Sequence, residues 1–242
     1  MRTKAIVFDK DGTLIDYSPY WYPVSQNAMR LCYERFGVSD ENTDEFIKSL
    51  GVTPDLTDIK GALPRGAHVE IFTAMADRII SLGATAAYDE ILHFSIEAFG
   101  KISKPYGKVE PTCENMRGVL TWLKEKGIYL ALITSDEIVG ARIALERLGV
   151  LDLFDEIIAH DGKSPAKPNS YYMDKFRSEH LFDREEVLMV GDTETDILFA
   201  LNSGVPSIGV GKTEENRDFL LSLGATAVFP DISYIPEWIE AD

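Results

Sequence analysis

Cysteine and histidine are scarce in this 242-residue chain, which contains two cysteines and four histidines. Cys32 and Cys113 form no CxxC pair, and no histidine has the spacing of a metal ligand. Disulfide frameworks and zinc sites depend on regular cysteine or histidine spacing. The sequence therefore predicts two buried thiols, with no disulfide framework and no zinc site.

Basic residues are also few, with 24 lysines and arginines against 40 aspartates and glutamates and a net charge of −16. Binding to nucleic acid releases counterions only if the protein offers a basic surface. The composition thus predicts no nucleic-acid partner. A phosphate ligand would need a locally positive pocket, or a metal ion, within an acidic protein.

Long hydrophobic runs are missing as well. The longest, at residues 129–133 and 187–190, are far shorter than the roughly 20 residues that cross a bilayer. The first residues lead directly into an expected strand without the pattern of a signal peptide. We therefore expect a cytoplasmic protein with no membrane partner; the sequence does not indicate its oligomeric state.

Short apolar runs rich in β-branched residues alternate with segments of helical period. This order is typical of a parallel sheet flanked by helices, so the predicted class is α/β with a doubly wound sheet. The expected strands span residues 4–9, 129–134, 156–159, 187–191, 207–210 and 226–229. The expected helices between them span residues 113–126, 138–148, 170–180, 195–202 and 214–223.

One long interval, residues 17–109, lacks a convincing strand. Amphipathic patterns at residues 26–36, 70–82 and 88–99 predict an inserted helical domain, with an irregular loop at 51–66. Residues 1–16 and 110–242 would then form the catalytic core. Because the insertion follows the first strand, it would cover the carboxyl ends of the strands and act as a cap.

The sharpest chemical signal is VFDKDGTL at residues 7–14, where two carboxylates follow the first strand. Residues two apart at the end of a strand point to one side, so Asp9 and Asp11 are expected to converge. With magnesium present, Asp9 could ligate the ion and attack phosphorus, while Asp11 exchanges protons with the leaving oxygen and with water. The alternative is an acidic turn that merely ends a strand.

A second acidic group, GDTETD, follows the strand at 187–191 and would emerge at the same sheet edge. Carboxylates gathered there would repel one another without a divalent ion. We interpret Asp192 as a metal ligand and Asp196 as a residue that supports the metal indirectly or through water. The alternative is a helix cap followed by an acidic first turn.

Two further candidates would contact phosphate. Thr134 ends a strand and Ser135 precedes a helix, so a hydroxyl and free N–H groups could cradle a phosphoryl group. Lys167 precedes Pro168 at a helix start, and its ammonium could neutralise phosphate and Asp9. Taken singly, these are more typical of a helix cap and a solvated loop lysine.

The order of these four pieces resembles the haloacid dehalogenase superfamily. Its first motif matches Asp9 and Asp11, its second Thr134, its third Lys167 and its fourth Asp192 with Asp196. The insertion resembles the first type of cap in that superfamily, as in phosphoglycolate phosphatases. The resemblance implies a Rossmann-like core with a mobile cap, and it covers residues 1–16 and 110–230 best.

The resemblance also implies roles for these residues. The side chain of Asp9, the backbone carbonyl of Asp11 and the carboxylate of Asp192 would hold Mg²⁺, while Thr134 and Lys167 would bind the transferring phosphoryl group. Superfamily dehalogenases lack the second aspartate of the first motif, so Asp11 favours phosphate ester chemistry. The expected activity is a phosphatase acting on a small phosphorylated metabolite through an aspartyl-phosphate.

Two alternatives to a phosphatase stay open at this point. A phosphomutase would return the phosphoryl group to another hydroxyl, and a binding protein could keep the fold without catalysis. The sequence does not choose among phosphoglycolate, sugar phosphates, nucleoside monophosphates and pyrophosphate. The aromatic residues at 17–22, together with Lys60 and Arg65, are candidates for a pocket in the cap. The alternatives are hinge or core packing for the aromatic residues and solvated loop charges for Lys60 and Arg65.

Overall fold

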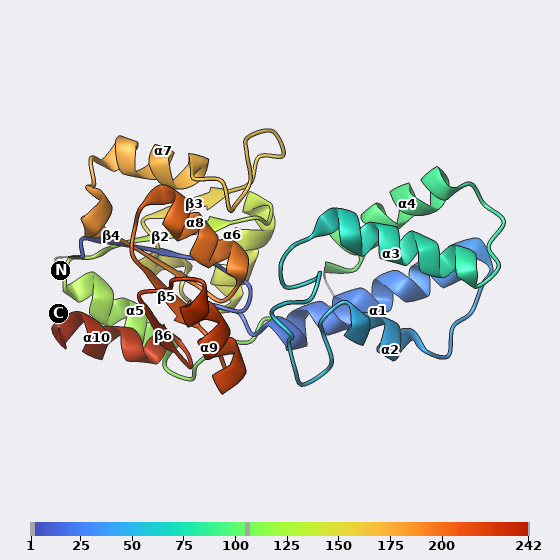
Figure 1. Cartoon of the computed structure of the whole chain (residues 1–242), viewed down its shortest axis with the longest axis horizontal. Helices are drawn as coiled ribbons and strands as arrows, with labels where there is room; N and C mark the ends of the chain where they lie inside the picture. Colours follow the sequence, from blue (N-terminus) through green and yellow to red (C-terminus); the bar gives the residue numbers. More distant parts are fainter. Residues whose placement is uncertain (1–2, 105–106, 242) are drawn as a thin grey trace. The chain divides into compact units, whose positions relative to one another are not determined.

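The structure is a computed structural model that describes residues 3–104 and 107–241. The chain divides into two compact units, each drawn in Figure 1. We call Met1–Asp16 with Glu110–Asp242 the core unit, and Tyr17–Val109 the inserted unit.

The core unit contains a six-stranded sheet in which every pairing is parallel, with strand order β3-β2-β1-β4-β5-β6. The predicted α/β class with a doubly wound parallel sheet is thereby confirmed. The strands are β1 (Ala5–Phe8), β2 (Tyr129–Thr134), β3 (Glu156–Ala159), β4 (Val187–Gly191), β5 (Ser207–Val210) and β6 (Ala227–Phe229).

The central strands end within two residues of one another. Phe8 of β1 lies opposite Leu132 of β2 and Val190 of β4. All four residues of β1 are completely buried, as expected of a strand covered on both faces. The residues that follow β1, β2 and β4 therefore leave the sheet at one edge, where open α/β sheets bind ligands.

Helices cover both faces of the sheet, because successive strand residues point to opposite sides. Ile6 and Phe8 pack with α5, α6 and α10, while Ala5 and Val7 pack with α7 and α8. The helices of the core unit are α5 (Met116–Glu125), α6 (Ile138–Arg147), α7 (Tyr171–His180), α8 (Glu194–Ser203), α9 (Glu214–Ser222) and α10 (Ile235–Ala241), with short 3₁₀ turns at Leu151–Leu153, Arg184–Glu186 and Ile232–Tyr234.

The inserted unit is helical, and its described residues contain no strand, only an isolated bridge between Val52 and Thr57. Residues 51–66 form a loop, as expected. The helices are α1 (Tyr17–Phe36), α2 (Thr43–Ser49), α3 (His68–Ser81) and α4 (Tyr88–Glu97), followed by a π-helical turn at Ala98–Ile102.

Helix α1 begins nine residues before the amphipathic pattern at 26–36, although Pro23 lies inside it. Proline has no N–H, so the carbonyl of Pro19 loses its helical partner at this point. The backbone N–H of Lys108 donates to that carbonyl instead, at 3.1 Å. A contact from the far end of the inserted unit thus replaces the missing hydrogen bond.

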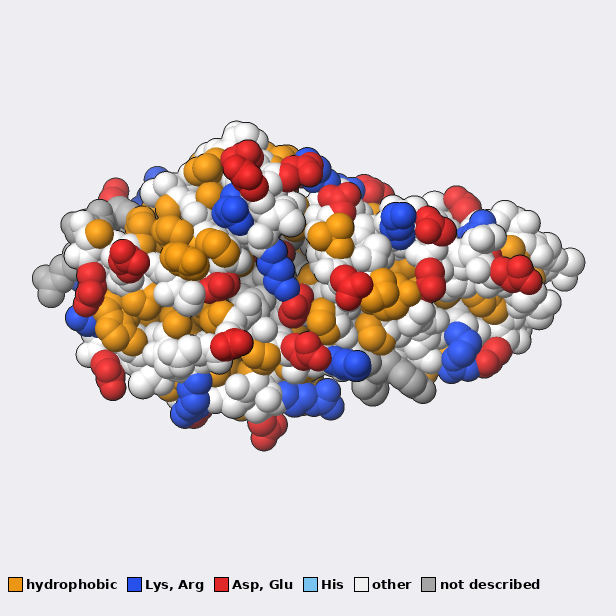
Figure 2. Space-filling model, turned by 90° about the horizontal axis from the view of Figure 1, so that it is seen from below, with side chains coloured by type: hydrophobic (Ala, Val, Ile, Leu, Met, Phe, Trp, Pro, Cys, Tyr) orange, Lys and Arg blue, Asp and Glu red, His pale blue; other side chains and the backbone are white. Residues whose placement is uncertain are grey.

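On the face shown in Figure 2, lysine and arginine side chains are scattered among acidic and hydrophobic ones. This distribution agrees with the acidic composition, and the absence of a nucleic-acid partner stays a prediction. Among the residues that the structure describes, no helix combines the length and the apolar character needed to span a bilayer.

Candidate active site

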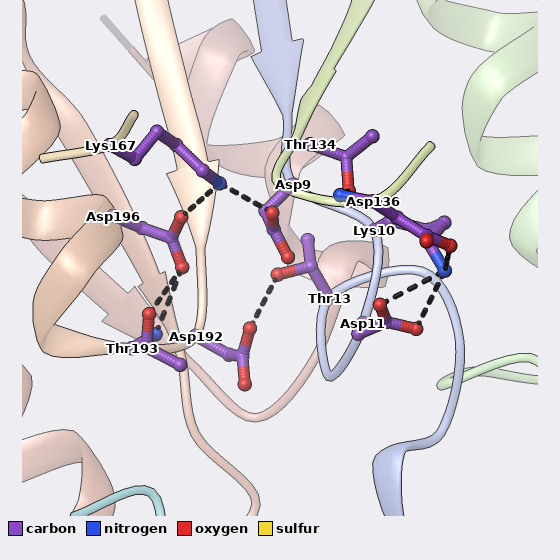
Figure 3. A network of polar contacts seen from close by, with 10 residues as sticks. All are labelled: Asp9, Lys10, Asp11, Thr13, Thr134, Asp136, Lys167, Asp192, Thr193 and Asp196. Atoms are coloured by element: carbon purple, nitrogen blue, oxygen red, sulfur yellow. Dashed lines mark hydrogen bonds and ion pairs between the residues drawn. The ribbon is translucent and has the colours of Figure 1, made fainter. Parts of the chain in front are cut away.

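Asp9 stands immediately after β1, at the sheet edge defined above. Its backbone N–H still donates to the carbonyl of Val190 at 2.8 Å, so the ladder between β1 and β4 fixes its position. Its carboxylate oxygen Oδ1 lies 2.5 Å from the ammonium of Lys167 (Figure 3). Asp9 is buried, with 8% of its surface exposed, so this ion pair is shielded from water.

Asp192 follows β4 and faces the loop after β1. The hydroxyl of Thr13 donates to its Oδ1 at 3.1 Å. Gly12 has φ of +86°, and a Cβ atom at that position would lie 2.0 Å from Oδ2 of Asp192. Only glycine therefore lets the loop pass so close to this carboxylate.

Asp196 lies in the first turn of α8 and has both carboxylate oxygens engaged. Oδ1 accepts from Lys167 at 2.7 Å, while Oδ2 accepts from the backbone N–H and the hydroxyl of Thr193, at 3.2 and 2.7 Å. Thr193 and Asp196 form a reciprocal capping box at the start of α8. The helix cap that the sequence allowed is therefore present, and the same carboxylate also anchors Lys167; the metal-related roles of Asp192 and Asp196 stay a prediction.

Thr134 ends β2 at the same edge and is buried. Its hydroxyl oxygen accepts a hydrogen bond from the backbone N–H of Asp136 at 3.1 Å. The side chain of Ser135 is exposed, and α6 begins three residues later, at Ile138. Figure 3 shows Thr134 on the side of Asp9 away from Lys167 and Asp196.

Asp11 does not point into the cluster formed by Asp9, Asp192 and Asp196. Both of its carboxylate oxygens lie about the ammonium of Lys10, at 3.0 and 2.9 Å (Figure 3). The extended chain ends at Phe8, and the carbonyl of Lys10 already accepts from Leu14 in a turn. The alternation of side chains along a strand therefore ends at Asp9. Because the backbone turns after this residue, the side chain of Asp11 does not point to the same side as that of Asp9.

Burial dominates the electrostatics of the cluster. It raises the pKa of Asp9 from 3.8 to about 7; the charges of Asp196 and Asp11 add to this rise, and Lys167 opposes it. Burial likewise raises the pKa of Asp192 well above its usual range. Burial would lower the pKa of Lys167, but Asp196 and Asp9 outweigh it and raise that pKa, so the ammonium stays charged.

A divalent cation fits this arrangement. Asp9, Asp192 and Asp196 each offer an oxygen within 4.8 Å of the others, and all three residues are buried. Lys167 supplies one positive charge near these three carboxylates, so the fully ionised cluster would carry a net charge of −2. Oxygen ligands of this kind suit Mg²⁺ or Ca²⁺. The engaged oxygens of Asp196 favour Asp9 and Asp192 as the direct ligands.

Four residues of the network in Figure 3 were not predicted to act in it: Lys10, Thr13, Asp136 and Thr193. A hydroxyl in a turn or before a helix usually serves local capping, so Thr13 and Thr193 carry no distinct signal in the sequence. Lys10 is completely buried, and lysine rarely is. The sequence signal that could have indicated a role for Lys10 was its position between Asp9 and Asp11.

Comparison with known proteins adds relatives of similar length. The chain is 26% identical over 208 residues to a phosphoglycolate phosphatase of Vibrio vulnificus strain YJ016, covering 86% of this chain and 83% of that protein. It is 27% identical over 221 residues to pyrophosphatase PpaX of Halalkalibacterium halodurans, covering 91% and 89%. Both similarities extend across the core and inserted units.

The fold is also shared with a solved structure from Haemophilus somnus 129PT, described as a predicted phosphoglycolate phosphatase. It has a TM-score of 0.74 at 16% identity and covers 98% of both chains. The family model of haloacid dehalogenase-like hydrolases matches residues 3–204, which include every candidate site residue. The predicted superfamily is thus confirmed, and the chain belongs to the haloacid dehalogenase-like hydrolases.

Proposed function

We propose that this protein is a magnesium-dependent phosphatase that hydrolyses a small phosphate monoester through a phosphoryl group carried on Asp9. The observation that carries the proposal is the buried ion pair between Asp9 and Lys167. The ammonium of Lys167 also pairs with Asp196. A lysine held at 2.5 Å from a carboxylate fixes that carboxylate's direction. The same ammonium can neutralise charge on a phosphoryl group transferred to it.

In the proposed first step, a carboxylate oxygen of Asp9 bonds to phosphorus as the ester oxygen leaves with a proton from Asp11. In the second step, water attacks phosphorus, its proton passes to Asp11, and the bond to Asp9 breaks. Asp9 is thereby regenerated and inorganic phosphate is released. Thr134, at the same edge, would hold the phosphoryl oxygens together with Lys167, and the N–H groups near Ser135 would assist.

A metal ion would be held by the side chains of Asp9 and Asp192, with Asp196 supporting them through Lys167 and Thr193. The backbone at Gly12 passes close to Asp192, which is compatible with a ligand from the carbonyl of the preceding residue, Asp11. When bound, such an ion would neutralise the cluster and polarise the phosphoryl oxygens. Magnesium is proposed because its ligands are hard oxygens.

Phosphoglycolate is the first substrate to test, because relatives of comparable length carry the name phosphoglycolate phosphatase. Pyrophosphate is the second, since another relative is named as a pyrophosphatase. Sugar phosphates and nucleoside monophosphates complete the panel. The inserted unit, proposed here as the cap, would choose among them.

The test is release of inorganic phosphate from this panel, with and without Mg²⁺, by the unmodified protein and by Asp9→Asn. We expect metal-dependent release that Asp9→Asn abolishes, because the amide keeps the shape but cannot act as the nucleophile. Conversion of a sugar phosphate to its isomer without phosphate release would indicate a phosphomutase instead. No turnover of either kind across the panel would contradict a catalytic role.

A further inference from the structure

Lys10 is a completely buried lysine placed between two carboxylates. Its ammonium lies 3.0 and 2.9 Å from the two oxygens of Asp11 and 3.1 Å from Oδ2 of Asp136 (Figure 3). Burying an ammonium is costly unless such partners surround it. An apolar side chain of similar length would fill this space without that cost. The presence of a charged group therefore suggests a task beyond packing.

Asp136 is itself firmly held in the loop after β2. Its Oδ1 accepts from the backbone N–H of Glu137 at 2.8 Å, and its own N–H donates to the hydroxyl of Thr134 at 3.1 Å. Lys10 thus ties Asp11, in the loop after β1, to a hydrogen-bonded residue of the loop that follows Thr134. The link joins the candidate proton donor to the candidate phosphate cradle.

We propose that Lys10 is a positioning residue that fixes the direction of the Asp11 carboxylate relative to Asp9. One ammonium that contacts both oxygens of Asp11 restricts the rotation of that carboxylate, and Asp136 keeps the ammonium in place. The Asp11 side chain remains 17% exposed, so a substrate oxygen can reach it. This inference rests on the proposed function, in which Asp11 protonates the leaving group.

If Lys10 positions Asp11, the effect of losing Lys10 on kcat/KM should depend on the leaving group of the ester. An ester with a poor leaving group needs a well-placed acid, whereas one with a good leaving group needs it much less. Phenyl phosphate and p-nitrophenyl phosphate differ little in shape, but phenol is the poorer leaving group. Misplacing Asp11 should therefore reduce kcat/KM for phenyl phosphate more than for p-nitrophenyl phosphate. General loss of structure would reduce both equally.

The experiment compares Lys10→Met, Asp11→Asn and the double variant on these two esters. The quantity compared is kcat/KM for phenyl phosphate divided by kcat/KM for p-nitrophenyl phosphate. It reports phosphoryl transfer to Asp9, because hydrolysis of the phosphorylated Asp9 is the same step for both esters. We expect both Lys10→Met and Asp11→Asn to lower the phenyl phosphate value at least about tenfold more than the p-nitrophenyl phosphate value. In the Asp11→Asn background, Lys10→Met should change the ratio less than about threefold.

The control is Lys124→Met, which removes a partly exposed lysine paired with Asp155 in the same unit and should leave the ratio unchanged. If Lys10→Met does not fold, Asp136→Asn replaces it as the test. This variant removes the charge that pairs with Lys10 but keeps Lys10 itself, and it should shift the ratio in the same direction. Equal losses on both esters would overturn the inference. If Asp11→Asn also leaves the ratio unchanged, the proposed role of Asp11 fails as well.

Discussion

At the scale of single residues, the candidate site depends on how closely the backbone at Gly12 approaches the carboxylate of Asp192. Gly12 has a positive φ, and a methyl group there would collide with Asp192. We expect Gly12→Ala to displace Asp192 and lower metal-dependent turnover at least about 100-fold, comparable to the loss of an important electrostatic contact in an active site. Steady-state phosphate release at saturating Mg²⁺ measures this.

The matched control is Gly37→Ala. Gly37 also has a positive φ, of +66°, but no atom lies within 4 Å of its added Cβ. That variant should lose about 1–2 kcal/mol of stability from backbone strain alone and keep its activity. Equal activity losses in the two variants would show that strain, rather than the collision with Asp192, is responsible.

Asp9 makes stability depend on pH when no metal is present. Burial raises the pKa of Asp9 to about 7 in the folded state, above the unfolded value of 3.8. The folded state therefore binds the proton more tightly, and the stability that this confers is lost as pH rises through 7. Asp9→Asn cannot ionise, so we expect it to become more stable relative to the unmodified protein between pH 5.5 and pH 8.

Urea unfolding in EDTA at the two pH values measures this difference. Asp218→Asn removes an exposed carboxylate of α9 and should show no such trend. A relative stability of Asp9→Asn that falls with rising pH would contradict the raised pKa of Asp9.

The sequence largely predicted which candidate residues lie together, but not how their side chains are oriented. Asp9, Lys167, Asp192 and Asp196 do lie together, because each follows or flanks the carboxyl end of a strand. The direction of Asp11 depends on a turn that begins one residue after Asp9, and period-two reasoning does not extend into turns. The burial of Lys10 depends on Asp136, which is 126 positions away in the chain.

At the scale of elements, the strands were predicted almost to the residue. Each combines a short apolar run with a clear boundary, and β2 to β5 match their expected ranges. Helices α2 and α10 were missed, since seven residues give too little of a 3.6-residue period to detect. Helix α1 was predicted too short because Pro23 conceals its first turns.

An ion pair joins two elements of the inserted unit. The guanidinium of Arg78 in α3 contacts both oxygens of Asp40, before α2, at 2.7 and 2.8 Å, and the Asp40 side chain is only 2% exposed. These hydrogen bonds hold the pKa of Asp40 below its usual value of 3.8. The stability from this pair is present above about pH 4 and is lost as pH falls through the lowered pKa.

We expect Asp40→Asn to cost about 1–3 kcal/mol at pH 7, as is usual for losing a hydrogen bond to a charged group. The cost should shrink as pH is lowered below 4. Chemical unfolding of the two proteins at pH 7 and pH 3 measures it. Glu90→Gln, which breaks a half-exposed pair with Arg35, should cost less than about 1 kcal/mol; a larger loss there than at Asp40 would contradict this account.

At the scale of the whole molecule, a net charge of −16 and a buried acidic cluster lead us to expect that divalent cations stabilise the folded state. A ligand that binds only the folded state stabilises it by about 2.7 kcal/mol at 100 times its Kd. We therefore expect Mg²⁺ to raise the Tm progressively with concentration. Asp192→Asn should remove most of this rise, because it deletes a proposed ligand.

Thermal unfolding in EDTA and across a Mg²⁺ series measures this rise. Asp218→Asn again serves as the control, since it removes the same charge from an exposed position. A magnesium-induced rise that persists in Asp192→Asn but disappears in Asp218→Asn would place the cation on the surface rather than in the cluster.

The central claim is that Asp9 carries the phosphoryl group. The most direct measurement mixes the protein with a substrate that it turns over, stops the reaction in acid within milliseconds, and locates phosphate on peptides by mass spectrometry. We expect phosphate on Asp9 in the unmodified protein and none in Asp9→Asn. A turning-over protein with no phosphate on Asp9 at any quench time, or with phosphate on another residue, would contradict the account.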